Sequence, residues 1–139
     1  MTTQVYDSNL VFVTLAGRPI DSGRAESEFV STEYNAEHVT ETVGADGEVT
    51  VARTNNNSGT LKIKLVQTSS GHTLLTQLYA TAKLTPGGTL MDFEIRDING
   101  AMLEHCQCYF KKPSASPYGA NAAEREWTFG TGDLIREAE

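Results

Sequence analysis

The strongest structural signal lies in residues 37–67, which read EHVTETVGADGEVTVARTNNNSGTLKIKLVQ. Two runs, Glu37–Val43 and Glu48–Thr54, flank an Asp-Gly pair, and such a pair between β-branched runs is a strong hairpin signal. After an Asn-rich turn, Thr60–Gln67 alternates apolar and polar side chains with a period of two. The stretch therefore predicts antiparallel strands joined by tight turns, with one face of the last strand buried.

One segment departs from this strand pattern. Ser69-Ser70-Gly71 offers an N-cap, and apolar residues then recur at helical spacing: they are Leu74, Leu75, Leu78, Tyr79 and Ala82. Pro86-Gly87-Gly88 ends the pattern, so the sequence predicts a helix over His72–Leu84. We expect its apolar stripe to pack on the core, covering the open side of a sandwich or the mouth of a barrel.

The rest of the chain reads as further strands and turns. The predicted strands are Asn9–Leu15, Glu26–Tyr34, Leu90–Arg96, Ala101–Phe110 and Glu124–Ile135. Gly17-Arg18-Pro19 and Asp97-Ile98-Asn99-Gly100 have the composition of turns, the latter closing a second hairpin. We therefore predict one domain over residues 1–139. It is mainly β, an antiparallel β-sandwich or barrel of hairpins with one flanking helix.

The charge balance is acidic, with 11 Lys and Arg against 18 Asp and Glu and a formal net charge of −7. Surfaces that grip phosphates are basic, so this balance argues against a protein whose main task is binding nucleic acid. No apolar run approaches the ~18 residues of a membrane helix, so we expect no membrane anchor. Residues 1–7 lack the basic and apolar regions of a secretory signal, which favours synthesis in the cytoplasm.

Motifs for catalysis and for metal or cofactor binding are absent from the sequence. No Gly-rich phosphate loop, His-Glu-x-x-His motif or nucleophile elbow occurs. Ser70-Gly71-His72 is better explained as a helix start, and the acidic residues between positions 26 and 41 as a solvated face. Cys106 and Cys108, one residue apart on a strand, are expected to stay reduced, because a disulfide between them would be strained. We expect no enzymatic activity, no metal and no cofactor.

Two segments place apolar residues on elements that can form sheet edges. These are the hairpin tip around Val43–Gly47 and the terminal segment Trp127–Phe129. Exposed edges invite pairing with another chain, and both segments carry few of the Lys or Pro residues that normally prevent it. On pattern alone, ordinary strands packed in the core explain these segments equally well.

Four groups of residues, in order along the chain, carry a wider pattern. They are Val43-Gly44-Ala45-Asp46-Gly47-Glu48-Val49 with the Asn-rich turn to Ser58-Gly59; Leu61–Ser69 leading into the Leu-rich helix; Phe93–Gly100 with Lys112-Pro113; and Ala122-Ala123-Glu124-Arg125-Glu126-Trp127-Thr128-Phe129. In sequence, order and spacing these groups resemble the corresponding stretches of the tail tube proteins of contractile-tailed bacteriophages. The resemblance spans most of the chain.

The resemblance implies a small β-sandwich with a flanking helix, similar to the type VI secretion tube protein. It implies hexameric rings that stack into a tube through which the genome passes. The partners would be further copies of the chain and the tail sheath, tape measure and baseplate proteins, in a virion tail assembled in the bacterial cytoplasm. By position, Val43, Gly44, Ala45, Asp46 and Gly47 are candidates for contact between rings, and Trp127 and Phe129 for contact with a neighbouring subunit.

The charge is consistent with such a tube. Six copies would carry a formal charge of −42, six times −7, and an acidic lumen would repel phosphates, so DNA would slide through without specific binding. Glu26, Glu28 and Glu33 interleave on one predicted strand and are the candidates for this lining. Two alternatives stay open: a tube subunit of a phage-tail-like bacteriocin or secretion particle, and a monomeric β-sandwich that binds a ligand in an aromatic-lined groove.

Overall fold

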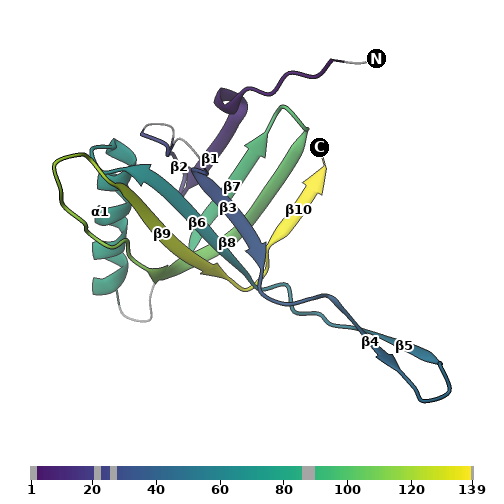
Figure 1. Cartoon of the computed structure of the whole chain (residues 1–139). Helices are drawn as coiled ribbons and strands as arrows, with labels where there is room; N and C mark the ends of the chain where they lie inside the picture. The colour runs from purple at the N-terminus through teal and green to yellow at the C-terminus, as the bar shows by residue number, and fades with distance from the viewer. Residues whose placement is uncertain (1–2, 21–22, 26–27, 86–89, 139) are drawn as a thin grey trace.

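An eight-stranded antiparallel sheet forms the body of the molecule (Figure 1). This computed structural model describes residues 3–20, 23–25, 28–85 and 90–138. The strands of the sheet are β1 (Val11–Leu15), β2 (Arg18–Pro19), β3 (Val30–Tyr34), β6 (Gly59–Val66), β7 (Met91–Asp97), β8 (Met102–Lys112), β9 (Glu124–Thr131) and β10 (Ile135–Ala138). The order is β2-β1-β7-β8-β9-β6-β3, and β10 pairs with the first part of β8, beyond the end of β9. The predicted mainly β, antiparallel architecture is confirmed.

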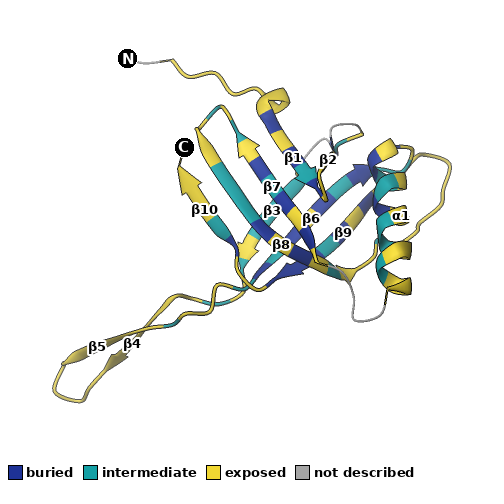
Figure 2. Cartoon of the chain, turned by 180° about the vertical axis from the view of Figure 1, so that it is seen from behind, coloured by how far each residue is buried: buried dark blue, intermediate teal, exposed yellow. Residues whose placement is uncertain are grey.

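Period-two alternation places one face of nearly every long strand in a common core. In β6, Leu61, Ile63 and Leu65 are buried while the residues between them are at least partly exposed. The sheet curves so strongly that β3, β6 and β9 lie across β1, β7 and β8 (Figures 1 and 2). A hydrogen bond of 2.7 Å from Thr32 Oγ1 on β3 to Glu104 Oε1 on β8 joins the two halves between partly buried side chains outside the core.

The helix α1 (Ser70–Leu84) covers one end of this curved sheet (Figure 2). Ser69 caps it by accepting a hydrogen bond of 3.0 Å from the Gly71 backbone N–H. Gly71 and Leu75 are its buried residues, and a Cβ at Gly71 would lie 3.0 Å from Leu65 Cδ1, so glycine allows close helix–sheet approach. The helix prediction is confirmed, with a start two residues earlier; the predicted stop at 86–88 lies outside the described residues.

Two turns differ in detail from the sequence prediction. After β1, the left-handed residues are Ala16 (φ 53°) and Gly17 (φ 78°), and Arg18–Pro19 already pairs with β1 as β2 instead of forming the turn. The hairpin between β7 and β8 is confirmed, but its left-handed residue is Ala101 (φ 52°). A short 3₁₀ helix, η1 (Ser8–Leu10), precedes β1.

The C-terminal prediction of one strand over Glu124–Ile135 is wrong, because the chain forms two strands there. Leu134, 2% exposed, packs into the core between them, and the Asp133 N–H donates to Thr131 Oγ1 at 3.3 Å where the chain leaves β9. β10 then pairs with β8. The strand predicted over Glu26–Tyr34 begins only at Val30 in the structure, and residues 26–27 lie outside the described residues.

The predicted hairpin over residues 37–54 is confirmed as a separate two-stranded sheet of β4 (Val39–Val43) and β5 (Val49–Arg53). It projects from the body of the molecule as an arm, at the end opposite α1 (Figures 1 and 2). Because β3 leads into β4 and β5 leads into β6, the arm continues a strand pair of the main sheet.

Candidate functional site

The tip of the arm is a short loop held by its own backbone. The Gly47 N–H donates to Gly44 O at 2.9 Å and the Gly44 N–H donates to Glu48 O at 2.7 Å. Gly47 adopts φ 87°, the left-handed conformation that closes a three-residue hairpin loop after a type I turn. The Asp-Gly signal therefore predicted the turn correctly, and it explains why residues 43–47 form a defined, exposed tip.

The two faces of the arm differ in chemistry. Cross-strand register places Val43 opposite Val49 and Glu41 opposite Val51, so valines dominate one face, whereas threonines and Ala52 form the other. We call the first the valine face; it carries Val39, Val43, Val49 and Val51, which are 43%, 66%, 53% and 58% exposed, together with Glu41 and Arg53. Every residue of β4 and β5 is exposed, so the described chain leaves this face uncovered.

The base of the arm is fixed to the body. The Asn35 N–H donates to Ser58 O at 3.0 Å, and the Leu134 N–H donates to Asn57 O at 3.0 Å. The rings of Tyr34 and His38 meet edge to face with centroids 4.7 Å apart. These contacts give the arm a fixed direction relative to the sheet, so that it presents the same face to any neighbouring molecule.

The expectation that Trp127 and Phe129 lie at an edge is wrong. β9 is flanked by β8 and β6, and the two side chains are only 3% and 0% exposed. Trp127 donates a hydrogen bond of 3.1 Å from Nε1 to His72 Nδ1 on α1, and both rings pack against Phe110. Their pattern of alternation is that of a central strand, and we leave them out of the candidate contact surface.

The face that carries Glu33 is mixed in charge. Glu28 and Glu33 are exposed, and together with Lys62, Lys64 and Glu126 they line a hollow of about 320 Å³ on the solvent face of β3, β6 and β9. Lys62 Nζ and Lys64 Nζ lie 3.9 and 3.6 Å from the Glu126 carboxylate. Glu26 lies outside the described residues. The acidic lining expected from the sequence is therefore partly balanced by two lysines.

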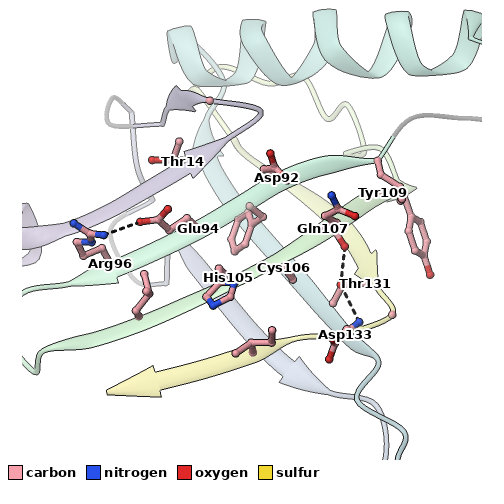
Figure 3. A pocket seen from close by; sticks show the side chains of 16 residues that line it. Thr14, Asp92, Glu94, Arg96, His105, Cys106, Gln107, Tyr109, Thr131 and Asp133 are labelled. Carbon is pink, nitrogen blue, oxygen red and sulfur yellow. Dashed lines mark hydrogen bonds and ion pairs between the residues drawn. The ribbon is translucent and has the colours of Figure 1, made fainter. Parts of the chain in front are cut away.

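A broader groove of about 940 Å³ lies on the solvent side of β1, β7, β8 and β10 (Figure 3). Its polar lining includes Asp92, Glu94, His105 and Asp133. Glu94 forms an ion pair with Arg96 at 3.4 Å, and His105 lies 3.6 Å from Glu137. Among the described residues no three His, Cys, Asp or Glu side chains come together as a metal site.

The two cysteines are free and buried. Burial raises the pKa of the Cys108 thiol to about 12, and it also raises the pKa of Cys106. Both thiols face the core on β8, so they act there as small apolar side chains. The described residues contain no helix long and apolar enough to cross a membrane.

Sequence reasoning missed Arg125, which is only 2% exposed. It stands on β9 two residues before Trp127 and faces the same side, opposite Leu65. Its Nη1 atom is buried and has no hydrogen-bond partner. The strand alternation itself was the available signal, because it places a cation among residues that face the core.

The fold is shared with several proteins of known structure. The chain is similar to the sheath/tube terminator of the extracellular contractile injection system PVC in its extended state (TM-score 0.66, 16% identity, covering 99% of this chain and 100% of that chain). It is also similar to a chain from the virion of a native gene transfer agent particle (TM-score 0.64, 14% identity, 96% and 100% covered), and to one from the PVC sheath–tube complex (TM-score 0.60, 14% identity, 96% and 91% covered).

Sequence then identifies the family. Residues 12–137 match the bacteriophage PhiTE tail tube protein family, and the chain belongs to that family. No curated protein matches the chain. The protein is thus a structural component of a phage-like tail and not an enzyme, which confirms the resemblance drawn from the sequence.

Proposed function

We propose that the protein is the repeating subunit of a phage tail tube, in which hexameric rings stack and the lumen conducts the genome into the host. The observation that carries this proposal is the exposed valine face on an arm of fixed direction. Family membership supports the tail location. As in the sequence-based expectation, the tail would be assembled in the bacterial cytoplasm.

In this proposal the arm makes the contact between rings, with Val43, Gly44, Ala45, Asp46 and Gly47 at its tip. An isolated two-stranded hairpin is marginally stable in water, and exposed strand edges favour pairing with another chain. Covering half-exposed valines stabilises a contact by roughly 1 kcal/mol each. A neighbouring copy that receives the arm would therefore stabilise the hairpin and hold the rings together.

We propose that Glu28 and Glu33 contribute to the lumen wall. Six copies carry a formal charge of −42, six times −7, which repels DNA and lets it pass without specific binding. The ion pairs of Lys62 and Lys64 with Glu126 lower the attraction of these lysines for phosphate. A structure of the assembled tube with Glu28 and Glu33 on its outer wall would overturn this assignment.

The other proposed partners are the tail sheath, tape measure and baseplate proteins. A solved structure to which this chain is similar comes from a sheath–tube complex, which supports a sheath around this tube. The alternative function, a tube subunit of a headless contractile particle, is favoured by the similarity to chains of an extracellular contractile injection system. The two functions differ in whether a capsid accompanies the tube.

The test is negative-stain electron microscopy of the purified chain, concentrated at neutral pH and moderate salt. We expect hollow rings or tubes of uniform width. In parallel, mass spectrometry of isolated tail particles should find the chain in a large, constant excess over the baseplate proteins. A chain that stays monomeric and is also absent from, or a minor component of, those particles would contradict the proposal.

A further inference from the structure

Arg125 is a buried cation whose charge is not neutralised within the described chain. Its side chain is 2% exposed, and Nη1 lacks a hydrogen-bond partner. None of the ion pairs among the described residues includes Arg125. Its neighbours along β9, Glu124 and Glu126, face the opposite side of the sheet by strand alternation.

Within the described part of the chain, no negative charge pairs with Arg125: its contacts are an aromatic ring and an imidazole. The ring of Tyr118 stacks on the guanidinium, with Arg125 Cζ 5.1 Å from the ring centroid. His72 is close enough that the positive charge of Arg125 contributes, after burial, to lowering the pKa of that imidazole. Leaving a buried charge uncompensated costs several kcal/mol, and buried polar groups nearly always have partners. These observations indicate a partner that lies outside the described residues of this chain.

The cover over Arg125 is thin. It is the connection 113–123, which has no regular secondary structure and is mostly exposed, with Tyr118 80% exposed. Its end is held by the hydrogen bond from the N–H of Gln67, the residue after β6, to Ala123 O, 3.0 Å long. A partner that displaces the Tyr118 ring would therefore reach the guanidinium without disturbing the core strands.

The partner chemistry follows from the guanidinium, whose planar fork binds a carboxylate with two parallel hydrogen bonds. Carboxylates exceed cations in this chain, 18 against 11. At the arm tip, Glu48 is exposed, and its carboxylate has no hydrogen bond or ion pair among the described residues. Asp46, beside it, already accepts a hydrogen bond of 3.1 Å from the Glu48 N–H.

The two groups lie at opposite ends of the molecule. β9 starts beside α1 and runs toward the base of the arm, so Arg125, its second residue, is far from the arm tip (Figures 1 and 2). Glu48 therefore cannot reach Arg125 of its own chain. A contact between opposite ends of two copies is head-to-tail, and such contacts repeat into an open stack when the rotation between copies does not close a ring.

We propose that Arg125 is the receptor for the arm of a second copy, whose Glu48 carboxylate enters beneath Tyr118 and pairs with the guanidinium. This inference rests on the proposed stacking of copies through the arm, and it names the receiving residue. The buried cation thereby gives the stack its direction, because the stabilising charge pair forms only between the tip of one copy and the α1 end of the next.

The first test compares folding with assembly. Arg125→Met removes the charge and keeps the side-chain volume, so the thermal midpoint of the monomer should stay the same or rise, while assembly into tubes falls at least tenfold. Glu48→Gln should reduce assembly similarly without affecting folding, and the double variant should be no worse than either single one. Glu37→Gln, an exposed carboxylate before the start of β4 and outside the valine face, is the matched control. Additive effects of the two variants would overturn the pairing.

The second test does not require stable tubes. Chains with Glu48→Cys and chains with Tyr118→Cys are mixed and treated with a short bismaleimide; Cys106 and Cys108 stay unreactive because they are buried. We expect several-fold more cross-linked dimer than from the pair Glu37→Cys and Tyr118→Cys, and a loss of the excess when Arg125→Met is added. Equal yields from both pairs would overturn the inference.

The outcomes also separate this inference from the proposed function. If Val43→Asp abolishes tubes while Arg125→Met and Glu48→Gln leave them unchanged, the arm holds the stack but Arg125 is not its receptor. If none of the three variants affects tubes, the proposed role of the arm fails as well.

Discussion

At the scale of single residues, the bond between Trp127 and His72 makes stability depend on pH. His72 Nδ1 accepts this bond, so the imidazole must be neutral at that atom. Burial, and then the positive charge of Arg125, hold the pKa of His72 below its ordinary value of 6.5. The unfolded chain therefore binds the proton at a higher pH, and the contribution of His72 to the free energy of unfolding is lost as the pH falls below about 6.5.

The measurement is chemical denaturation at pH 7.5 and 5.5. We expect the wild-type chain to lose more stability over this interval than His72→Gln, whose side chain stays neutral and offers an acceptor to Trp127. Other groups titrate in the same pH range. The test is therefore the difference between the loss of stability in the wild-type chain and the loss in His72→Gln. The same loss in both would show that His72 does not cause it.

The two buried thiols make a second prediction. Since burial raises the pKa of Cys108 to about 12 and that of Cys106 as well, both remain protonated and covered at pH 8, and the thiolate is the reactive form. A thiol reagent such as Ellman's reagent should label neither cysteine in the folded chain and both in denaturant. Rapid labelling of one thiol without denaturant would mean that β8 opens locally.

Sequence alternation determined which side chains share a face, but it could not reveal the neighbours of each strand. It correctly placed Trp127 and Phe129 on one face of their strand, whereas their expected position at an edge was wrong, because β9 lies between β8 and β6. Strand neighbours depend on pairing between distant segments, which local periodicity does not record. The same limit hid Arg125, whose unpaired burial becomes visible only once its surroundings are known.

At the scale of elements, docking of α1 should depend on a single buried side chain. Leu75 is fully buried on the helix face that meets the sheet, and truncating a buried leucine to alanine typically costs 2–5 kcal/mol. We expect Leu75→Ala to lower the free energy of unfolding in urea by about this amount. Leu84, at the end of the same helix, is 84% exposed, so Leu84→Ala should change the free energy of unfolding by less than about 0.5 kcal/mol. Similar effects of both would indicate that the helix contributes by its propensity and not by packing.

Elements were predicted best where a turn residue and a periodic run coincide. The arm was predicted with its ends nearly correct, because Asp-Gly fixes the loop and β-branched residues fix the strands. The break between β9 and β10 was missed, because Leu134 continues the apolar pattern locally while its side chain turns into the core. A local pattern cannot distinguish a continuing strand from one that bends to pair with β8.

At the scale of the whole molecule, the proposed tube separates the roles of body and arm. The body owes its stability to the core of the curved sheet. No residue of β4 or β5 belongs to that core, and the arm contacts the body only at its base. We propose that residues 1–139 unfold as one domain, so that circular dichroism and tryptophan fluorescence from Trp127 report a single transition. The arm should therefore tolerate substitutions that leave this transition unchanged.

A charge on the valine face should then abolish stacking without affecting folding. Val43→Asp places a carboxylate where the proposal buries a valine against the next ring, and burying an unpaired charge costs far more than the valine contributes. Thr42→Asp adds the same charge to the adjacent residue on the opposite face. With equal concentrations and the same monomer unfolding midpoint, tubes seen by negative-stain microscopy should be lost in Val43→Asp and kept in Thr42→Asp. Loss of tubes in both variants would mean that the added charge alone opposes assembly. Tubes in both would mean that the ring contact lies elsewhere. Only a contact made by the valine face predicts a difference between the two variants, because they add the same charge to opposite faces of one hairpin.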